Sequence, residues 1–351
     1  MLRKKICLLL CAVMFITVFT VDVPKEVGAQ VTEEWVARYN SPGNYPDDVN
    51  DIAVDSSGNV YVTGGLCLPY NDPSDYITVK YDSYGNELWV RRYDGPANKA
   101  DYAFALALDQ SGNVYVTGRS DGSNTHSDYA TVKYDPDGNE LWVARYNGPE
   151  NMGDQAFAIA IDSSGKVYVT GKSTGIGTKN DYATVAYDYL GNELWVARYN
   201  GPGNHDDSPY THAISLDSVG NVYVTGHSTG SETDWDYATI KYDAFGNQLW
   251  VARYNGPGNE TDYATSIVID DSGNVFVTGA SSGGSTDFDY ATIKYDSEGN
   301  EIWVQRYNGP GNGNDNAYAI VLDSFTNVYV TGYSYGGVTQ GDFATLKYDS
   351  D

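Results

Sequence analysis

The chain of 351 residues carries 47 acidic and 21 basic residues, for a net charge of −26 at pH 7. Such an acidic excess disfavours nucleic acid and anionic lipid surfaces as partners and favours cations, cationic surfaces or simple solubility outside the cell. Of the three cysteines only Cys67 lies beyond residue 29, so a chain cleaved there can form no internal disulfide and must rest on packing and strand pairing.

The first 29 residues have the pattern of a secretory signal peptide. Three basic residues follow Met1 and Leu2, an apolar run covers residues 6–21, and the small residues Gly28 and Ala29 precede Gln30. A retained membrane anchor is the alternative, but the run is short for a span. We therefore expect cleavage before Gln30, no membrane insertion afterwards, and a secreted, periplasmic or cell-surface location.

Residues 128–147, DYATVKYDPDGNELWVARYN, predict two strands joined by a tight turn. Asp135-Pro-Asp-Gly138 suits a type I turn, with Asp first, Pro second and Gly fourth. A four-residue turn pairs Val132 with Leu141 and Lys133 with Glu140, the latter as a cross-strand ion pair. A similar hairpin with an Asp-x-x-Gly turn covers residues 103–118. Each unit is thus expected to hold four short strands.

This unit recurs along the chain. The tryptophan of the fourth strand falls at Trp35, Trp89, Trp142, Trp195, Trp250 and Trp303, at intervals of 53 to 55 residues. Helical periodicity is absent between the copies. Four strands at such a period indicate a propeller blade. The predicted fold class is all-β: residues 30–351 form a single domain, a six-bladed β-propeller of four-stranded blades.

The two ends of the repeat array complement each other. The first WVARY strand has no DYATVKY strand before it, and the last DYATVKY-like strand has no WVARY after it. We expect the N-terminal strand, residues 31–40, to pair with the C-terminal strand, residues 343–349, and so to close the ring as the outer strand of the last blade. Closure removes the two strand edges that an open array exposes.

Three motifs recur in fixed order: D-x-x-G-N-V-Y-V-T-G, D-Y-A-T-V-K-Y-D and G-N-E-L-W-V-A-R-Y-N. On these motifs the chain resembles the bacterial β-propeller repeat family that is called seven-bladed, although six units are present here. The resemblance covers residues 31–351 and implies a propeller that is secreted or exposed at the cell surface. It supplies no catalytic residues. The Asp-x-x-Gly-Asn hairpin is also similar, more weakly, to that of six-bladed NHL-type propellers.

Residues present in every unit are expected to be scaffold, and residues present in one unit are free to form a site. The repeated tyrosines and tryptophans are therefore expected in the core. Repeated aspartates at the starts of strands have oxygen ligands suited to Ca²⁺, or else cap loops through backbone hydrogen bonds. The capping role is the favoured one, and no other cofactor is expected. The weak Ca²⁺ candidates are Asp101, Asp154, Asp262 and Asp315.

The loops between second and third strands differ most from unit to unit. Variation confined to one face is where repeat proteins keep their binding surfaces, and exposed aromatic side chains there can stack on sugars or anchor a protein. The expected partner is an extracellular protein or a glycan. The ligand-binding candidates are Tyr70, His126, Lys179, His227, Trp235, Phe288 and Tyr335.

Catalytic motifs are missing from the sequence: it has no G-x-S-x-G elbow, phosphate loop or zinc motif. We therefore expect a non-enzymatic binding or structural module. The alternative is an extracellular polysaccharide hydrolase or lyase with a propeller fold. That reading draws attention to Thr211 and His212, in the first strand that departs most from the repeat.

Overall fold

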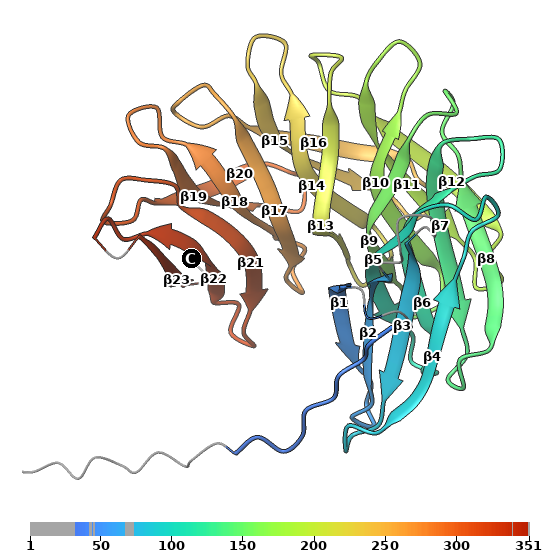
Figure 1. Ribbon diagram of the computed structural model, residues 1–351. Helices are drawn as coiled ribbons and strands as arrows, with labels where there is room; N and C mark the ends of the chain where they lie inside the picture. The colour runs from blue at the N-terminus through green and yellow to red at the C-terminus, as the bar shows by residue number, and fades with distance from the viewer. Residues whose placement is uncertain (1–31, 42–43, 45, 67–73, 339, 350–351) are drawn as a thin grey trace, which may run out of the picture. The chain divides into compact units, whose positions relative to one another are not determined.

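A computed structural model describes residues 32–41, 44, 46–66, 74–338 and 340–349. The chain divides into two compact units, Met1–Val36 and Ala37–Asp351. Residues 32–36 of the first unit form no helix or strand, and all the described strands belong to the second unit (Figure 1). The predicted signal peptide, residues 1–29, lies outside the described residues.

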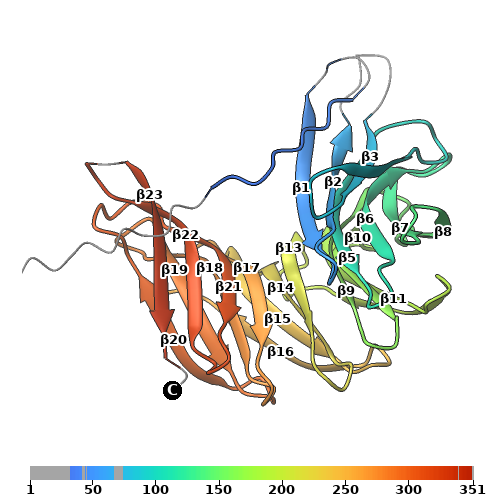
Figure 2. The ribbon, with the colours of Figure 1, turned by 90° about the horizontal axis from the view of Figure 1, so that it is seen from below.

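The second unit consists of six antiparallel sheets whose strands follow chain order. The first strands of consecutive sheets contact one another along the middle of the fold (Figures 1 and 2). These first strands are β1 (Asp47–Val54), β5 (Asp101–Leu108), β9 (Asp154–Ile161), β13 (Asp207–Leu216), β17 (Asp262–Ile269) and β21 (Asn316–Leu322). The second strands are β2 (Val60–Leu66), β6 (Val114–Asp121), β10 (Val167–Thr174), β14 (Val222–Thr229), β18 (Val275–Ser282) and β22 (Val328–Tyr335).

The outer half of each sheet is formed by the DYATVKY and WVARY segments. The third strands are β3 (Asp75–Tyr81), β7 (Ser127–Tyr134), β11 (Asn180–Tyr187), β15 (Trp235–Tyr242), β19 (Phe288–Tyr295) and β23 (Gly341–Tyr348). The fourth strands are β4 (Glu87–Tyr93), β8 (Glu140–Tyr146), β12 (Glu193–Tyr199), β16 (Gln248–Tyr254) and β20 (Glu301–Tyr307). The sixth sheet has three strands, β21, β22 and β23. The predicted pairing of residues 31–40 with residues 343–349 stays a prediction.

The tight turns have the expected chemistry, but the predicted register of the outer hairpin is wrong. Gly138 N–H donates to the carbonyl of Asp135 at 2.9 Å, and Asp135 N–H donates to the carbonyl of Asn139 at 2.9 Å. Tyr134 pairs with Glu140, one residue beyond the predicted Asn139, and a bulge between Lys133 and Tyr134 shifts the pairing by one more, so that Lys133 lies opposite Trp142. The predicted ion pair with Glu140 is replaced: Lys133 lies 4.8 Å from the centre of the Tyr115 ring.

Apolar cores lie between neighbouring sheets, which explains why both faces of each hairpin carry apolar residues. Between the second and third sheets, Tyr115 and Tyr129 pack with Val167, Val169 and Val185, and all are fully buried. The repeated tyrosines are therefore core residues, as predicted. Each full burial of such a side chain stabilises the fold by roughly 1.5–3 kcal/mol.

Hydrogen bonds repeat at the same sheet interfaces. The Tyr129 hydroxyl donates to the carbonyl of Ala183 in the next sheet at 3.0 Å. The Trp142 indole and the Lys133 ammonium both donate to the carbonyl of Tyr189, in a turn of the next sheet, each at 3.2 Å. Residues that recur in most units thus join one sheet to the next. The fold is a six-bladed β-propeller, as the repeats predict.

The start of the second unit packs on the first sheet. Ala37 and Tyr39 contact a buried cluster formed by Ile77, Val79 and Tyr81. Ala144 and Tyr146, which occupy the same positions in β8, pack in the same way on the third sheet. Residues 37–39 therefore cover the first sheet as a fourth strand covers the sheet that follows it.

Candidate functional site

The first strand of the fourth sheet breaks the repeat. β13 is 10 residues long, whereas β5, β9 and β17 have 8. Its register runs from Pro209 opposite Gly226 directly to Ile214 opposite Val224, so four residues of β13 bulge where β14 has one. His212, within this bulge, has φ of 62°, a left-handed conformation that costs free energy for a residue with a side chain. The bulge brings Tyr210 and Thr211 to the wall of a pocket of about 440 Å³.

Aromatic side chains from three sheets line this pocket. Phe104 of β5 and Phe157 of β9 lie with ring centres 5.5 Å apart. Tyr210 of β13 lies 5.4 Å from the ring of His227, which stacks on Trp235 at 4.1 Å. A concave site with aromatic walls is the kind of surface on which the apolar face of a sugar or another flat ligand packs.

Polar groups stand among these rings. Lys172 of β10 lies 5.8 Å from the centre of the Phe157 ring. Asp206 accepts a hydrogen bond from the Asn180 amide at 2.8 Å and pairs with Lys179 at 3.5 Å. The pocket thus combines aromatic walls with a few groups able to orient a ligand by hydrogen bonds.

His227 is buried in the pocket wall, with 6% of its surface exposed. Burial is the main reason why the pKa of its imidazole is lowered to about 4; the nearby Asp206 opposes the shift and Lys172 adds to it. The ring is therefore neutral at neutral pH. Its Nδ1 atom has no hydrogen-bond partner within the described part of the chain.

The structure brings two of the predicted ligand-binding residues, His227 and Trp235, to this pocket. A third, Lys179, does not line the pocket but pairs with Asp206, which does. Phe288 lies nearby: it contacts Tyr263, whose ring is 5.7 Å from Tyr210.

The remaining predicted residues lie elsewhere. His126 is exposed in the loop before β7, and Tyr70 falls outside the described residues. Tyr335 packs directly over Gly311 and Gly313, where a side chain would clash with its ring. Its position is that of a loop anchor.

The aspartates proposed as weak Ca²⁺ ligands cap loops. Asp101 accepts the N–H of Gly95 at 2.6 Å, and Asp154 accepts that of Gly148 at 2.6 Å. The same bond recurs at Asp262 and Asp315. These bonds agree with the favoured capping role, and Ca²⁺ binding itself stays open to measurement.

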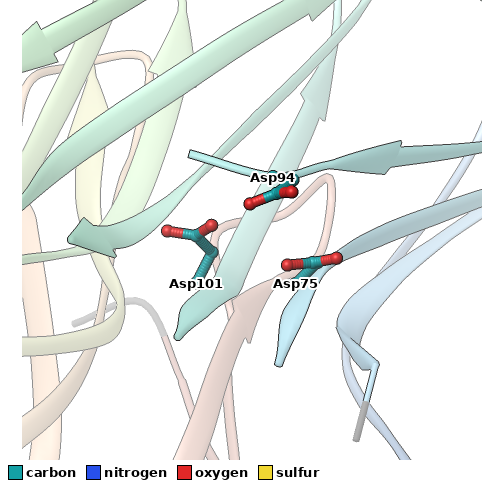
Figure 3. A group of neighbouring side chains, drawn as sticks. All are labelled: Asp75, Asp94 and Asp101. Carbon is teal, nitrogen blue, oxygen red and sulfur yellow. The ribbon is translucent and has the colours of Figure 1, made fainter. Parts of the chain in front are cut away.

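One interface adds a third carboxylate. Asp75, Asp94 and Asp101 offer oxygens that all lie within 4.8 Å of one another (Figure 3). Asp75 is also paired with Arg92. Asp94 is exposed and occupies the place of an asparagine, such as Asn147, in the other units. Burial is the main cause that raises the pKa of Asp101, and the negative charge of Asp94 raises it further.

Sequence reasoning missed most of the pocket. Phe104, Phe157 and Lys172 lie in strands that look regular, and Tyr210 lies in the bulge. The signal that could have located it is the interval of 55 residues between Trp195 and Trp250, two more than between Trp142 and Trp195. That excess falls between Asp207 and Asp217, and so marks an insertion in the inner strand.

The described part of the chain contains no helix with the length and apolar character that crossing a bilayer requires. The fold and its pocket define a β-propeller with one irregular blade. The family model "SBBP, Beta-propeller repeat" matches residues 34–64, 89–124, 194–232, 249–289 and 302–338, together more than half of the chain. The protein belongs to this beta-propeller repeat family.

Comparisons with individual proteins show the fold alone. An uncharacterized WD repeat-containing protein of Acanthamoeba polyphaga mimivirus is 26% identical over 167 residues, which cover 42% of this chain and 11% of the viral protein. The β-propeller domain of the Trilobed protease from Pyrococcus furiosus, described as having an open velcro topology, has a TM-score of 0.50 at 8% identity, covering 87% of this chain and 83% of that one. PorZ, a surface component of the type-IX secretion system of Porphyromonas gingivalis, has a TM-score of 0.50 at 15% identity, covering 89% and 41%.

Proposed function

We propose that the protein is a secreted or cell-surface binding module, without enzymatic activity, that holds a glycan in the pocket beside β13. The observation that carries this proposal is the aromatic wall formed by Phe157, Tyr210 and Trp235 together with the hydrogen-bonding groups of Asn180 and His227. Sugars present an apolar face edged by hydroxyl groups, which matches this combination.

A protein ligand fits the pocket less well. Protein interfaces of ordinary size bury about 800 Å² on each partner, whereas this site is a small concave pocket of about 440 Å³. The remaining loop candidates, such as His126, are spread over other blades. A glycan therefore accounts for the concentrated group of residues better than a protein does.

The test is a glycan array probed with the chain from Gln30 onward, with Trp235→Ala as the site variant and His126→Ala as the control on the same variable loops. We expect binding that Trp235→Ala weakens by about tenfold or more, the loss measured for one aromatic anchor, and that His126→Ala leaves unchanged. Binding to no glycan, or binding indifferent to Trp235, would contradict the proposal.

A second candidate function, a polysaccharide hydrolase or lyase, is favoured by one observation. His212 is exposed within the bulge and holds a left-handed backbone conformation, and strained residues cluster at active sites. Release of reducing ends or unsaturated products from polysaccharides, abolished by His212→Ala, would establish this activity in place of simple binding.

A further inference from the structure

We propose that the pocket beside β13 selects a sugar that carries an anionic group, carboxylate or sulfate, and that Lys172 is the residue that recognises the charge. This inference rests on the proposed function, because it names the class of glycan that the same pocket takes. The net charge of the chain, −26, disfavours an anionic ligand, so the attraction for its charge must come from groups in the pocket itself.

Most cations of the chain already have a structural role. Five arginines form ion pairs with aspartates in the first or second position of the third strands. Lysines of the third strands lie over the rings of aromatic residues in the same sheet, as Lys133 does over Tyr115. Within the described residues, Lys172 has neither an ion pair nor a hydrogen bond, and its one contact of this kind is the face of Phe157. Its ammonium group remains available to a ligand.

Among the described residues that line the pocket, the one carboxylate already has partners in the protein. Asp206 pairs with Lys179 and accepts a hydrogen bond from Asn180, so its charge is shared with groups of the protein. His227 is neutral because it is buried. The pocket therefore carries one uncompensated positive charge, and an anionic ligand group is the complement of that charge.

The rest of the wall suits the uncharged part of a sugar. The rings of Tyr210 and Trp235 flank His227, and such rings can pack on the apolar face of a sugar. A simple inorganic anion would use Lys172 and leave the aromatic walls empty. A sugar with one charged substituent uses both.

The experiment measures calorimetric binding of oligogalacturonate and oligomannuronate for the carboxylate, and of carrageenan oligosaccharides for the sulfate. Each is compared with its carboxyl-reduced or desulfated counterpart. The site variant is Lys172→Gln. The matched control is Lys166→Gln, which removes the same charge from the turn at the other end of the same sheet. Thermal melting verifies that both variants fold.

We expect at least one charged oligosaccharide to bind, its neutral counterpart to bind about tenfold or more weakly, and Lys172→Gln to remove the difference while Lys166→Gln keeps it. The kind of oligosaccharide that binds identifies carboxylate or sulfate as the anionic group. Equal binding of charged and neutral forms, unaffected by Lys172→Gln, would overturn this inference and leave the glycan-binding function standing. Failure of every oligosaccharide here and of the wider array would overturn both.

Discussion

The imidazole of His227 stacks on the indole of Trp235, with ring centres 4.1 Å apart and an interplanar angle of 26°. The two residues lie at the same end of one antiparallel strand pair: Trp235 begins β15, and His227 lies two residues before the end of β14. The stack therefore places a titratable group in the wall of the pocket, against an indole whose outer face is open to a ligand. Because the imidazole is buried, its protonation also affects the stability of the fold.

The first prediction concerns the acid side of the stability profile. The folded pKa of His227, about 4, lies below the ordinary value of 6.5, so between these values the unfolded chain binds a proton that the folded chain does not. The stability that depends on the neutral ring is fully present above pH 6.5 and is lost as the pH falls towards 4. The total loss is roughly 3 kcal/mol by linkage.

His227→Phe keeps an aromatic ring against Trp235 and removes the titration. Urea unfolding of parent and variant at several pH values from 7 to 4 measures the difference. The parent should lose more unfolding free energy than the variant over this range, and Asp206 and Lys172, which also influence the imidazole, stay the same in both. Parallel profiles for the two proteins would show that His227 is not buried in its neutral form.

The second prediction compares a buried ion pair with an exposed one. Arg198 donates to Asp181 at 2.8 Å, to the Ser173 hydroxyl at 2.6 Å and to the Tyr146 hydroxyl of the preceding sheet at 2.9 Å. Arg198→Met leaves Asp181 buried without its partner, which should lower the unfolding free energy by about 3–5 kcal/mol.

The matched comparison is Lys179→Met. That variant breaks the pair between Lys179 and Asp206, whose side chains are 57% and 36% exposed, respectively. Exposed pairs contribute at most about 1 kcal/mol to the free energy of unfolding. Chemical denaturation measures both variants. Similar losses in the two would contradict the assignment of Arg198 as a link between sheets.

The features of the fold and of the pocket that the sequence predicts are those that repeat from unit to unit. Asp135, Gly138 and Trp142 recur in every complete unit, so their roles in turns and sheet interfaces follow from local turn chemistry and periodicity. The register of the outer hairpin at Lys133 could not be predicted from the sequence, because the bulge there depends on the packing of Trp142 and Lys133 on the next sheet. The pocket was predicted only in part. Phe104, Lys172 and Trp235 come from three blades, and no local sequence pattern indicates that residues so far apart in the chain lie together.

The third prediction concerns calcium at the group formed by Asp75, Asp94 and Asp101. Asp101 caps a loop and Asp75 is paired with Arg92, so two of the three carboxylates already have partners. Calorimetric titration should show affinity no tighter than the millimolar range of extracellular modules. Asp94→Asn, which gives this interface the residue found in the other units, should leave the melting temperature nearly unchanged. Tight stoichiometric binding that Asp94→Asn abolishes would instead establish a calcium site.

The last prediction is that residues 31–40 complete the sixth blade, whose sheet has three strands. Ala37 and Tyr39 already cover Ile77, Val79 and Tyr81 of the first sheet, as a fourth strand does elsewhere. In the second sheet, Val143 of the fourth strand pairs with Val132 of the third. If residues 31–40 pair in the same register, Val36 should lie opposite Leu346, the equivalent of Val132.

Two measurements test this pairing. Deleting residues 30–40 uncovers the first sheet and leaves β23 as a bare edge, and several apolar side chains worth roughly 1.5–3 kcal/mol each lose their burial. Because a domain is stable by only about 5–15 kcal/mol, the truncated protein should unfold or aggregate.

In a Cys67→Ser background, Val36→Cys with Leu346→Cys should form a disulfide on mild oxidation, because directly opposed residues in antiparallel strands lie close enough for one. The register control, Val36→Cys with Lys347→Cys, should remain reduced. Cooperative melting of the truncated protein within a few degrees of the parent, together with no cross-link, would show that the N-terminal WVARY segment is a tail and that the blade closes without it.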